Sequence, residues 1–135
     1  MPKPEGLSLR FDKQDAIRPD LLEAMAYHGQ PQEIQIKTNE FSAVCPFSGL
    51  PDLASLEIIY FPSNRIVELK SFKYYLVSFR QVGIYQEEVT DRIARDLWEL
   101  LSPHYLCVTT IYATRGGIDT RSTIERGRKP TLSTL

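Results

Sequence analysis

The chain has 135 residues and a net charge of -1 at pH 7, and 42% of its residues are hydrophobic. This length and composition predict one globular domain, and the near-zero charge argues against a protein that binds nucleic acid by bulk electrostatics. There is no long apolar run and no signal-like segment, so we expect a cytoplasmic protein with no membrane contact.

The first predicted elements are an arm and two strands. Residues 1–31 form a loosely held arm that carries a short helix or a single turn within 19–28. Residues 32–38 alternate between apolar and polar side chains, as in a half-buried strand. Residues 54–61 are rich in Leu, Ile and Tyr and form a second strand, which Pro62 ends.

Two helices and two further strands follow. The first helix runs from about Glu68 to Arg80 and the second spans about 87–101, each with one apolar face. Residues 105–113 and 118–125 are antiparallel strands, joined by a turn at Arg115-Gly116-Gly117. Residues 127–135 are a flexible tail.

The order strand, strand, helix, helix, strand, strand predicts the fold class. We expect an α+β domain over residues 32–126, in which an antiparallel four-stranded sheet carries two helices on one face. Such a sheet has two open edges, and side-by-side assembly into a ring would cover them. We therefore predict a homo-oligomer.

Cys45 lies in a Pro-bounded loop, Cys45-Pro46-Phe47-Ser48-Gly49-Leu50-Pro51-Asp52. Two prolines restrict the backbone and Gly49 permits a sharp turn, so the loop could present a reactive thiolate. Asp52 lies close enough in sequence to donate or accept a proton in the same pocket. The alternatives are an inert Cys45 and an Asp52 that only caps a turn.

The first helix carries a row of cations. Lys70, Lys73 and Arg80 lie within about 80° of one another on a helical projection, with no acid among them. Such a row can bind an anion, although a solvated lysine face is the common alternative. The only other cysteine, Cys107, falls within a strand and is expected to be a small buried thiol.

Gln86 and Glu87 begin the second helix. A carboxylate here can accept paired N–H donors from the edge of a guanine-like ring, and the amide beside it can bind other edge groups. The alternative is that the acids only cap the helix and suit its dipole. With two histidines and no Cys-x-x-Cys or His-x-x-x-His spacing, we expect no metal site.

Three segments together resemble the NADPH-dependent 7-cyano-7-deazaguanine reductases, the nitrile reductases of queuosine biosynthesis, a tRNA modification pathway. They are Glu68-Leu69-Lys70-Ser71-Phe72-Lys73-Tyr74-Tyr75, the Cys45–Asp52 loop and Arg115-Gly116-Gly117-Ile118. The similarity covers roughly residues 32–126, and the length resembles the short, single-module form of the family.

The resemblance implies a mechanism and a set of site residues. Cys45 would add to the nitrile of 7-cyano-7-deazaguanine to give a thioimide, Asp52 would supply protons, and NADPH would reduce the adduct to the amine. The implied substrate-binding residues are Val67, Glu68, Leu69, Gln86 and Glu87. The implied cofactor-binding residues are Lys70, Lys73 and Arg115.

The resemblance also implies a tunnel fold, whose subunits form rings with active sites at their interfaces. One position departs from the pattern, because many members have a histidine where this chain has Gln86, and glutamine does not titrate near neutral pH. Two alternatives remain: an amidinotransferase that acts on a nitrile-bearing tRNA, and a non-catalytic purine- or pterin-binding ring. A zinc-dependent cyclohydrolase is disfavoured because His and Cys ligands are few.

Overall fold

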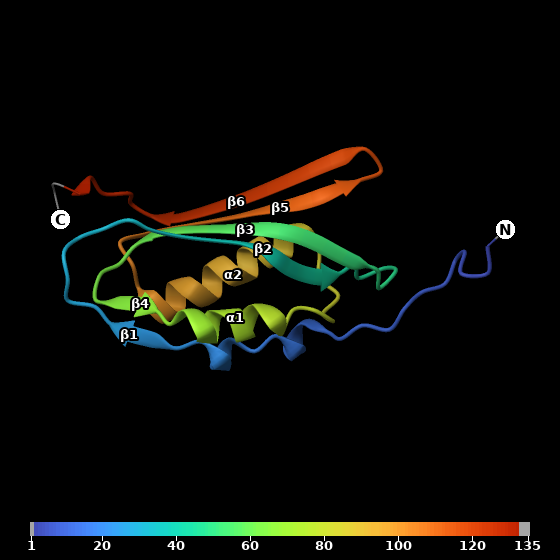
Figure 1. Ribbon diagram of the computed structural model, residues 1–135, viewed down its shortest axis with the longest axis horizontal. Coiled ribbons are helices and arrows are strands. Elements are labelled where there is room, and N and C mark those ends of the chain that lie inside the picture. The colour runs from blue at the N-terminus through green and yellow to red at the C-terminus, as the bar shows by residue number, and fades with distance from the viewer. Residues whose placement is uncertain (1, 133–135) are drawn as a thin grey trace.

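A four-stranded antiparallel sheet carries two helices on one face (Figure 1). The structure is a computed structural model and describes residues 2–132. Across the sheet the strands follow the order β2 (Ile34–Val44), β3 (Pro51–Phe61), β5 (Tyr105–Arg115) and β6 (Ile118–Gly127). The predicted α+β class and sheet are therefore confirmed, with β2 and β6 at the open edges.

The helices are α1 (Leu69–Val77) and α2 (Gln86–Leu101). Helix α1 begins after Glu68, whose carboxylate accepts hydrogen bonds from the backbone N–H groups of Lys70 and Ser71 at 3.0 and 2.9 Å. It ends before the predicted Arg80, because the chain tightens there into turns such as that from Phe79 N–H to the Leu76 carbonyl. Within residues 2–132, no helix has the length and apolar character needed to cross a membrane.

The hydrophobic core lies between the sheet and the helices. Along β3 every second side chain is buried, as the two-residue period of a strand requires when one face is covered. Helix α2 buries a stripe at helical spacing against the same face. Core side chains that are at most 1% exposed include Leu56, Ile58 and Tyr60 from β3 and Val89, Ile93 and Leu97 from α2.

Strand β2 is longer than the predicted 32–38 because it contains a bulge. Thr38 pairs with Leu56 and Phe41 pairs with Ala54, so three residues of β2 span the distance of two on β3. The bulge changes which residues face the core, and β2 continues to Val44. Strand β3 likewise begins at Pro51, earlier than predicted, since proline is tolerated at the first position of a strand.

The N-terminal segment packs along the helical side of the sheet (Figure 1). The short helix or turn predicted within 19–28 is a single 3₁₀ turn, Pro19–Leu21, and a second such turn spans Gln14–Ala16. The strand β1 (Ala24–Ala26) then pairs antiparallel with β4 (Arg65–Val67). This pairing explains why the helical spacing around residue 25 does not produce a helix.

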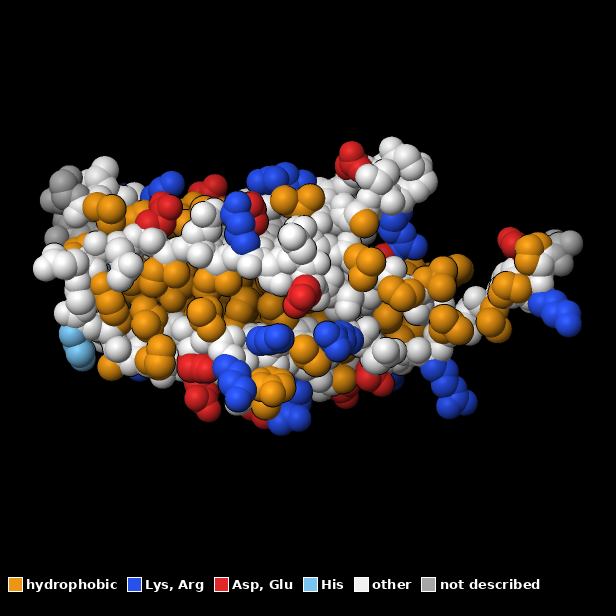
Figure 2. Space-filling view, in the orientation of Figure 1, with side chains coloured by type: hydrophobic (Ala, Val, Ile, Leu, Met, Phe, Trp, Pro, Cys, Tyr) orange, Lys and Arg blue, Asp and Glu red, His pale blue; other side chains and the backbone are white. Residues whose placement is uncertain are grey.

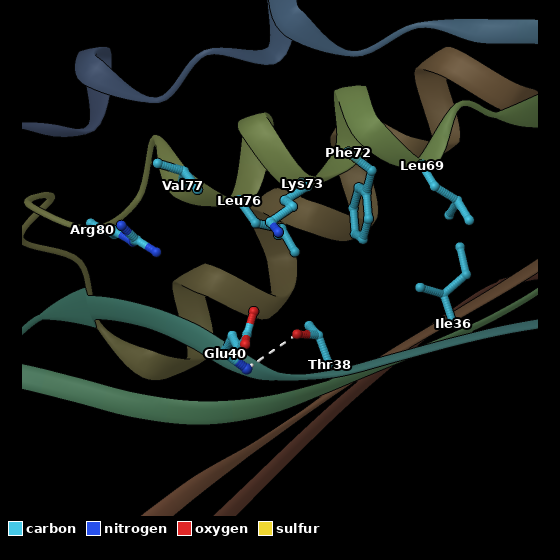
Figure 3. Close-up of a pocket in the computed structure, with 9 residues that line it drawn as sticks. All are labelled: Ile36, Thr38, Glu40, Leu69, Phe72, Lys73, Leu76, Val77 and Arg80. Carbon is cyan, nitrogen blue, oxygen red and sulfur yellow. Dashed lines mark hydrogen bonds between the residues drawn. The ribbon is translucent and has the colours of Figure 1, made fainter.

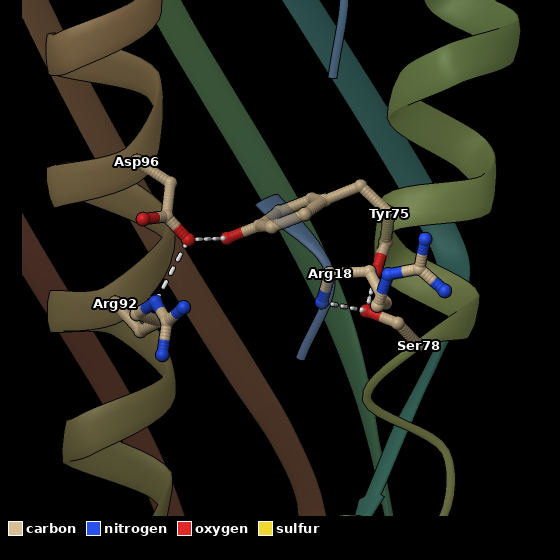
Figure 4. A network of polar contacts seen from close by, with 5 residues as sticks. All are labelled: Arg18, Tyr75, Ser78, Arg92 and Asp96. Atoms are coloured by element: carbon tan, nitrogen blue, oxygen red, sulfur yellow. Dashed lines mark hydrogen bonds and ion pairs between the residues drawn. The ribbon is translucent and has the colours of Figure 1, made fainter. Parts of the chain in front are cut away.

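A polar network joins the two helices beneath the sheet (Figure 4). The Tyr75 hydroxyl of α1 donates to the Asp96 carboxylate of α2 at 2.6 Å, and Arg92 Nε donates to the same oxygen at 2.8 Å. The Tyr75 side chain is fully buried, and Asp96 is only 9% exposed. At the end of α1, the Ser78 hydroxyl accepts the backbone N–H of Arg18 at 3.0 Å and so attaches the N-terminal segment.

We expect Tyr75→Phe to lower the free energy of unfolding by about 1.5–3 kcal/mol, because it removes a buried hydrogen bond to a charged acceptor. Urea unfolding followed by circular dichroism measures the change. Tyr74→Phe is the matched control, since Tyr74 is the neighbouring residue and is 56% exposed. Equal stability of the two variants would contradict the role given to the network.

Candidate active site

Cys45 follows directly after β2, in a tight turn that leads into β3. The Cys45 backbone N–H donates to the Leu50 carbonyl at 2.9 Å, and the Gly49 N–H donates to the Cys45 carbonyl at 2.8 Å. Gly49 has a φ of +74°, which a residue with a side chain rarely adopts. The thiol is therefore held on a closed backbone turn and is half-buried.

The turn lowers the pKa of the Cys45 thiol. The largest cause is a hydrogen bond from the Ser48 backbone N–H, and the Phe47 N–H and the Ser48 hydroxyl act in the same direction. Partial burial and the charge of Asp52 oppose the effect without cancelling it. Backbone donors thus favour the thiolate, which is the nucleophilic form.

The N-terminal segment supports this turn from outside. The Leu9 backbone N–H donates to the Ser48 carbonyl at 2.8 Å. A Cβ added at Gly49 would lie 2.3 Å from the Leu9 carbonyl oxygen, so only glycine fits between the turn and the segment. The residues that hold the thiol therefore include a stretch close to the N-terminus.

Asp52 is buried on β3, with only 4% of its surface exposed, and it forms an ion pair with Arg115. The pair depends on a second bulge: Tyr112 pairs with Thr120 and Arg115 with Ile118, so three residues of β5 span two of β6. The bulge turns the Arg115 side chain to the face that carries Asp52. Sequence spacing alone did not predict this contact.

The start of α2 lies beside the Cys45 turn. Val44 N–H donates to the Val82 carbonyl at 3.0 Å, and Ile84 N–H donates to the Val44 carbonyl at 3.2 Å. These bonds attach the segment before α2 to the end of β2. Gln86 and Glu87, in the first turn of α2, are thereby brought to the same end of the sheet as Cys45 and Asp52.

Val67, Glu68 and Leu69 lie near the other end of the sheet. The Val67 backbone N–H donates to the hydroxyl of Tyr60 at 3.2 Å, and Tyr60 is eight residues from Asp52 along β3. At about 3.3 Å per residue, the two positions on the strand are about 26 Å apart. Within one chain, these residues and Cys45 cannot contact the same purine-sized molecule.

Lys73 lines a groove between α1 and β2 (Figure 3). Lys73 and Arg80 extend from the α1 side toward Glu40 on β2, and the remaining lining is largely apolar. Its cavity volume is about 210 Å³, which suits part of a dinucleotide rather than the whole molecule. On the same face, apolar side chains are exposed between the edge of the sheet and α1 (Figure 2).

The groove has the charge needed for a phosphate group. Among the ion pairs of residues 2–132, none involves Lys70, Lys73 or Arg80. Lys70 borders a neighbouring hollow with Glu68 and Leu69. Arg115, predicted with the two lysines, lies instead at the Asp52 end of the sheet, so within one chain it is separated from Lys70 and Lys73.

Tyr112 is a candidate site residue that the sequence analysis missed. It is buried on β5, and its hydroxyl has no hydrogen-bond partner among the described residues. The two-residue period of a strand could have placed Tyr112 on the inner face, but its nearness to Asp52 depends on the strand pairing. The described residues contain no cluster of three or more His, Cys, Asp or Glu side chains that could hold a metal ion.

Comparisons with known proteins show which family this chain resembles. The family model described as QueF-like protein matches residues 51–131. Two proteins named NADPH-dependent 7-cyano-7-deazaguanine reductase, from Thermotoga petrophila and Thermotoga maritima, are each 58% identical to the chain over 89% of its length and 88% of theirs. A protein of the same name from Thermoanaerobacter pseudethanolicus is 47% identical over 83% of this chain and 87% of its own.

A solved structure supports the fold alone. The crystal structure of the archaeosine synthase QueF-Like in the apo form superposes with a TM-score of 0.69. The superposition covers 76% of this chain and all of that one, at 24% sequence identity.

We expect Gly49→Ala to raise the pKa of the Cys45 thiol toward its ordinary value, because the added Cβ would displace the turn and its N–H donors. The rate of iodoacetamide alkylation of the Cys45 peptide, measured against pH by mass spectrometry, reports the change. Gly6→Ala is the control, since Gly6 also has positive φ but has no atom within 4 Å of an added Cβ. An unchanged pH profile in Gly49→Ala would rule out this support for the thiolate.

Proposed function

This chain belongs to the family of QueF-like proteins, and from that membership we infer that it is an NADPH-dependent oxidoreductase of queuosine biosynthesis. It reduces the nitrile of 7-cyano-7-deazaguanine to the primary amine of 7-aminomethyl-7-deazaguanine. The observation that carries the inference is the 58% identity to reductases of that name, over most of both chains.

Cys45 is the proposed nucleophile. Its thiolate adds to the nitrile carbon, a carbon–sulfur bond forms, and the nitrile nitrogen takes a proton to give a thioimide. The lowered pKa of the thiol supports this role, because more of the reactive form is present near neutral pH. NADPH supplies two hydrides per nitrile, which with two protons complete the amine and restore the thiol.

Asp52 is the proposed proton donor, and the ion pair with Arg115 bears on how it works. The pair fixes the direction of the carboxylate at the Cys45 end of the sheet. Arg115 must leave the carboxylate before Asp52 can carry a proton to the substrate. A cofactor phosphate is an anion that could draw Arg115 away, which is compatible with its proposed role in cofactor binding.

The remaining site residues divide into two proposed groups. Gln86 and Glu87 bind the N–H edge of the heterocycle, because a carboxylate and an amide together match its donors and acceptors. Val67, Glu68 and Leu69 also contact the substrate, and Lys70 and Lys73 bind the phosphates of NADPH. The cationic, partly apolar groove beside α1 supports the cofactor assignment.

The active site is proposed to form between two subunits of a homo-oligomeric ring. The separation of about 26 Å along β3 supports this, since a purine spans less than half of it. The open edges of β2 and β6 are the surfaces by which subunits could pair. Residues 32–126 are the proposed tunnel-fold domain, with 1–31 and 127–135 flanking it.

We expect the purified protein to consume two NADPH molecules for each molecule of 7-cyano-7-deazaguanine. The absorbance of the reduced nicotinamide measures this consumption. Without NADPH, intact mass spectrometry should show the protein plus one nitrile. The adduct should be absent in Cys45→Ala and retained in Cys107→Ala, the matched cysteine control. If NADPH is not consumed and ammonia is incorporated into a nitrile-bearing tRNA, the protein is an amidinotransferase instead.

We expect Cys45→Ala and Glu68→Gln each to be inactive alone. After equal amounts are mixed and reassociated, about a quarter of the wild-type rate should return. The reason is that one interfacial site in four then receives its intact Cys45 from one subunit and its intact Glu68 from the other. The control mixes wild type with the double variant. For this control mixture, an interfacial site again predicts about a quarter of the wild-type rate. A site within one chain predicts about half of the wild-type rate for the control mixture and no activity for the mixture of the two single variants.

A further inference from the structure

The buried hydroxyl of Tyr112 is the strongest unexplained polar group of the described chain. Tyr112 is 5% exposed, and its oxygen has no hydrogen-bond partner within residues 2–132. An unsatisfied buried hydroxyl destabilises a fold by about 1–3 kcal/mol. Phenylalanine would fill the same space without that cost, so the hydroxyl calls for a functional explanation.

Strand pairing places Tyr112 beside Asp52. Tyr112 pairs with Ala54 on β3, and Asp52 lies two residues before Ala54 on the same inner face. The Asp52 carboxylate is bound by Arg115, and it forms no hydrogen bond with the Tyr112 hydroxyl. The Tyr112 hydroxyl therefore lies at the same end of the sheet as Cys45 and Asp52 but donates no hydrogen bond to the Asp52 carboxylate.

Helix packing places Glu87 on the other side of the same hydroxyl. The Thr90 hydroxyl of α2 and the Thr110 hydroxyl of β5 are 2.6 Å apart, which fixes α2 over β5. Glu87 lies three residues before Thr90 on the same helix face, and Tyr112 lies two residues after Thr110 on the same strand face. The step from Thr90 to Glu87 along α2 and the step from Thr110 to Tyr112 along β5 lead toward the same end of the sheet.

The electrostatic surroundings keep Tyr112 neutral. Burial is the first cause that raises the pKa of its hydroxyl, and the charges of Asp52 and Glu87 raise it further. A neutral phenol keeps its O–H donor, so the hydrogen bond of Tyr112 left unfilled among the described residues suits an acceptor on a molecule bound at this end of the sheet.

We propose that Tyr112 binds the ring carbonyl oxygen of the substrate. On a 7-cyano-7-deazaguanine ring, this oxygen lies between the N–H edge and the carbon that bears the nitrile. The Tyr112 hydroxyl is near enough to Glu87 and to Asp52 for both charges to act on it, and Asp52 lies at the Cys45 end of the sheet. The inference rests on the proposed function, and it makes Tyr112 a residue that selects 6-oxo purine-like nitriles over analogues without the carbonyl.

The test compares Tyr112→Phe with wild type on two nitriles, 7-cyano-7-deazaguanine and the analogue that lacks the 6-oxo group. We expect kcat/KM for the first to fall about tenfold, the value of one hydrogen bond, and kcat/KM for the analogue to change little. The unfolding temperature without ligand should not fall, because the variant removes an unsatisfied group. A purely structural role for the hydroxyl would lower it.

Tyr105→Phe is the matched control. Tyr105 is a buried tyrosine on the same strand, and its hydroxyl donates to Glu125 at 2.9 Å. It should not change the ratio of the two kcat/KM values. An equal loss on both nitriles in Tyr112→Phe, or no loss on either, would overturn the carbonyl assignment while leaving the reductase intact. Failure of wild type to reduce either nitrile would overturn the proposed function and this inference together.

Discussion

The pairing of the end of β2 with the start of β3 is the constraint on which the candidate site depends. Val44 lies opposite Pro51 and Ala43 opposite Asp52, so the turn between them must close within a few residues. That closure points backbone N–H groups at the Cys45 sulfur and brings a buried carboxylate to the same end of the sheet. Backbone geometry thus lowers the pKa of the Cys45 thiol and places the Asp52 carboxylate at the same end of the sheet, and the ion pair with Arg115 fixes the direction of that carboxylate.

The length of the sheet has a further effect on function. The same strand that begins beside Cys45 ends where Tyr60 binds the backbone before α1. One chain therefore presents thiol, acid and the start of α2 at one end, and the Val67–Leu69 segment at the other. With the Val67–Leu69 segment in its proposed substrate-binding role, a neighbouring subunit would have to bring the two ends together, and catalysis would then depend on assembly.

The sequence predicted the elements well and their contacts poorly. Composition, alternation and helical spacing located three of the sheet strands and both long helices within a few residues, and the first half of β2. The bulge after Thr38 reversed the alternation and hid the second half of β2, while pairing with β4 overrode the helical spacing near Met25. The Pro-bounded loop identified Cys45 and Asp52 as candidates, and the family resemblance supplied their implied roles. The position of Tyr112 and its contact region could not be read from one sequence because they depend on strand register, and the Arg115 contact depends also on a bulge.

The contact between Leu9 and Ser48 makes the two chain termini unequal. Protein ends usually tolerate trimming, because few interactions hold them. Here a truncation of the N-terminus past Leu9 would remove the backbone hydrogen bond to Ser48. That bond supports the turn that carries the Cys45 sulfur, although the two segments are far apart in sequence. Affinity tags and fusions are therefore better attached at the carboxyl end, where the last described residues lie beyond β6 and remote from that turn.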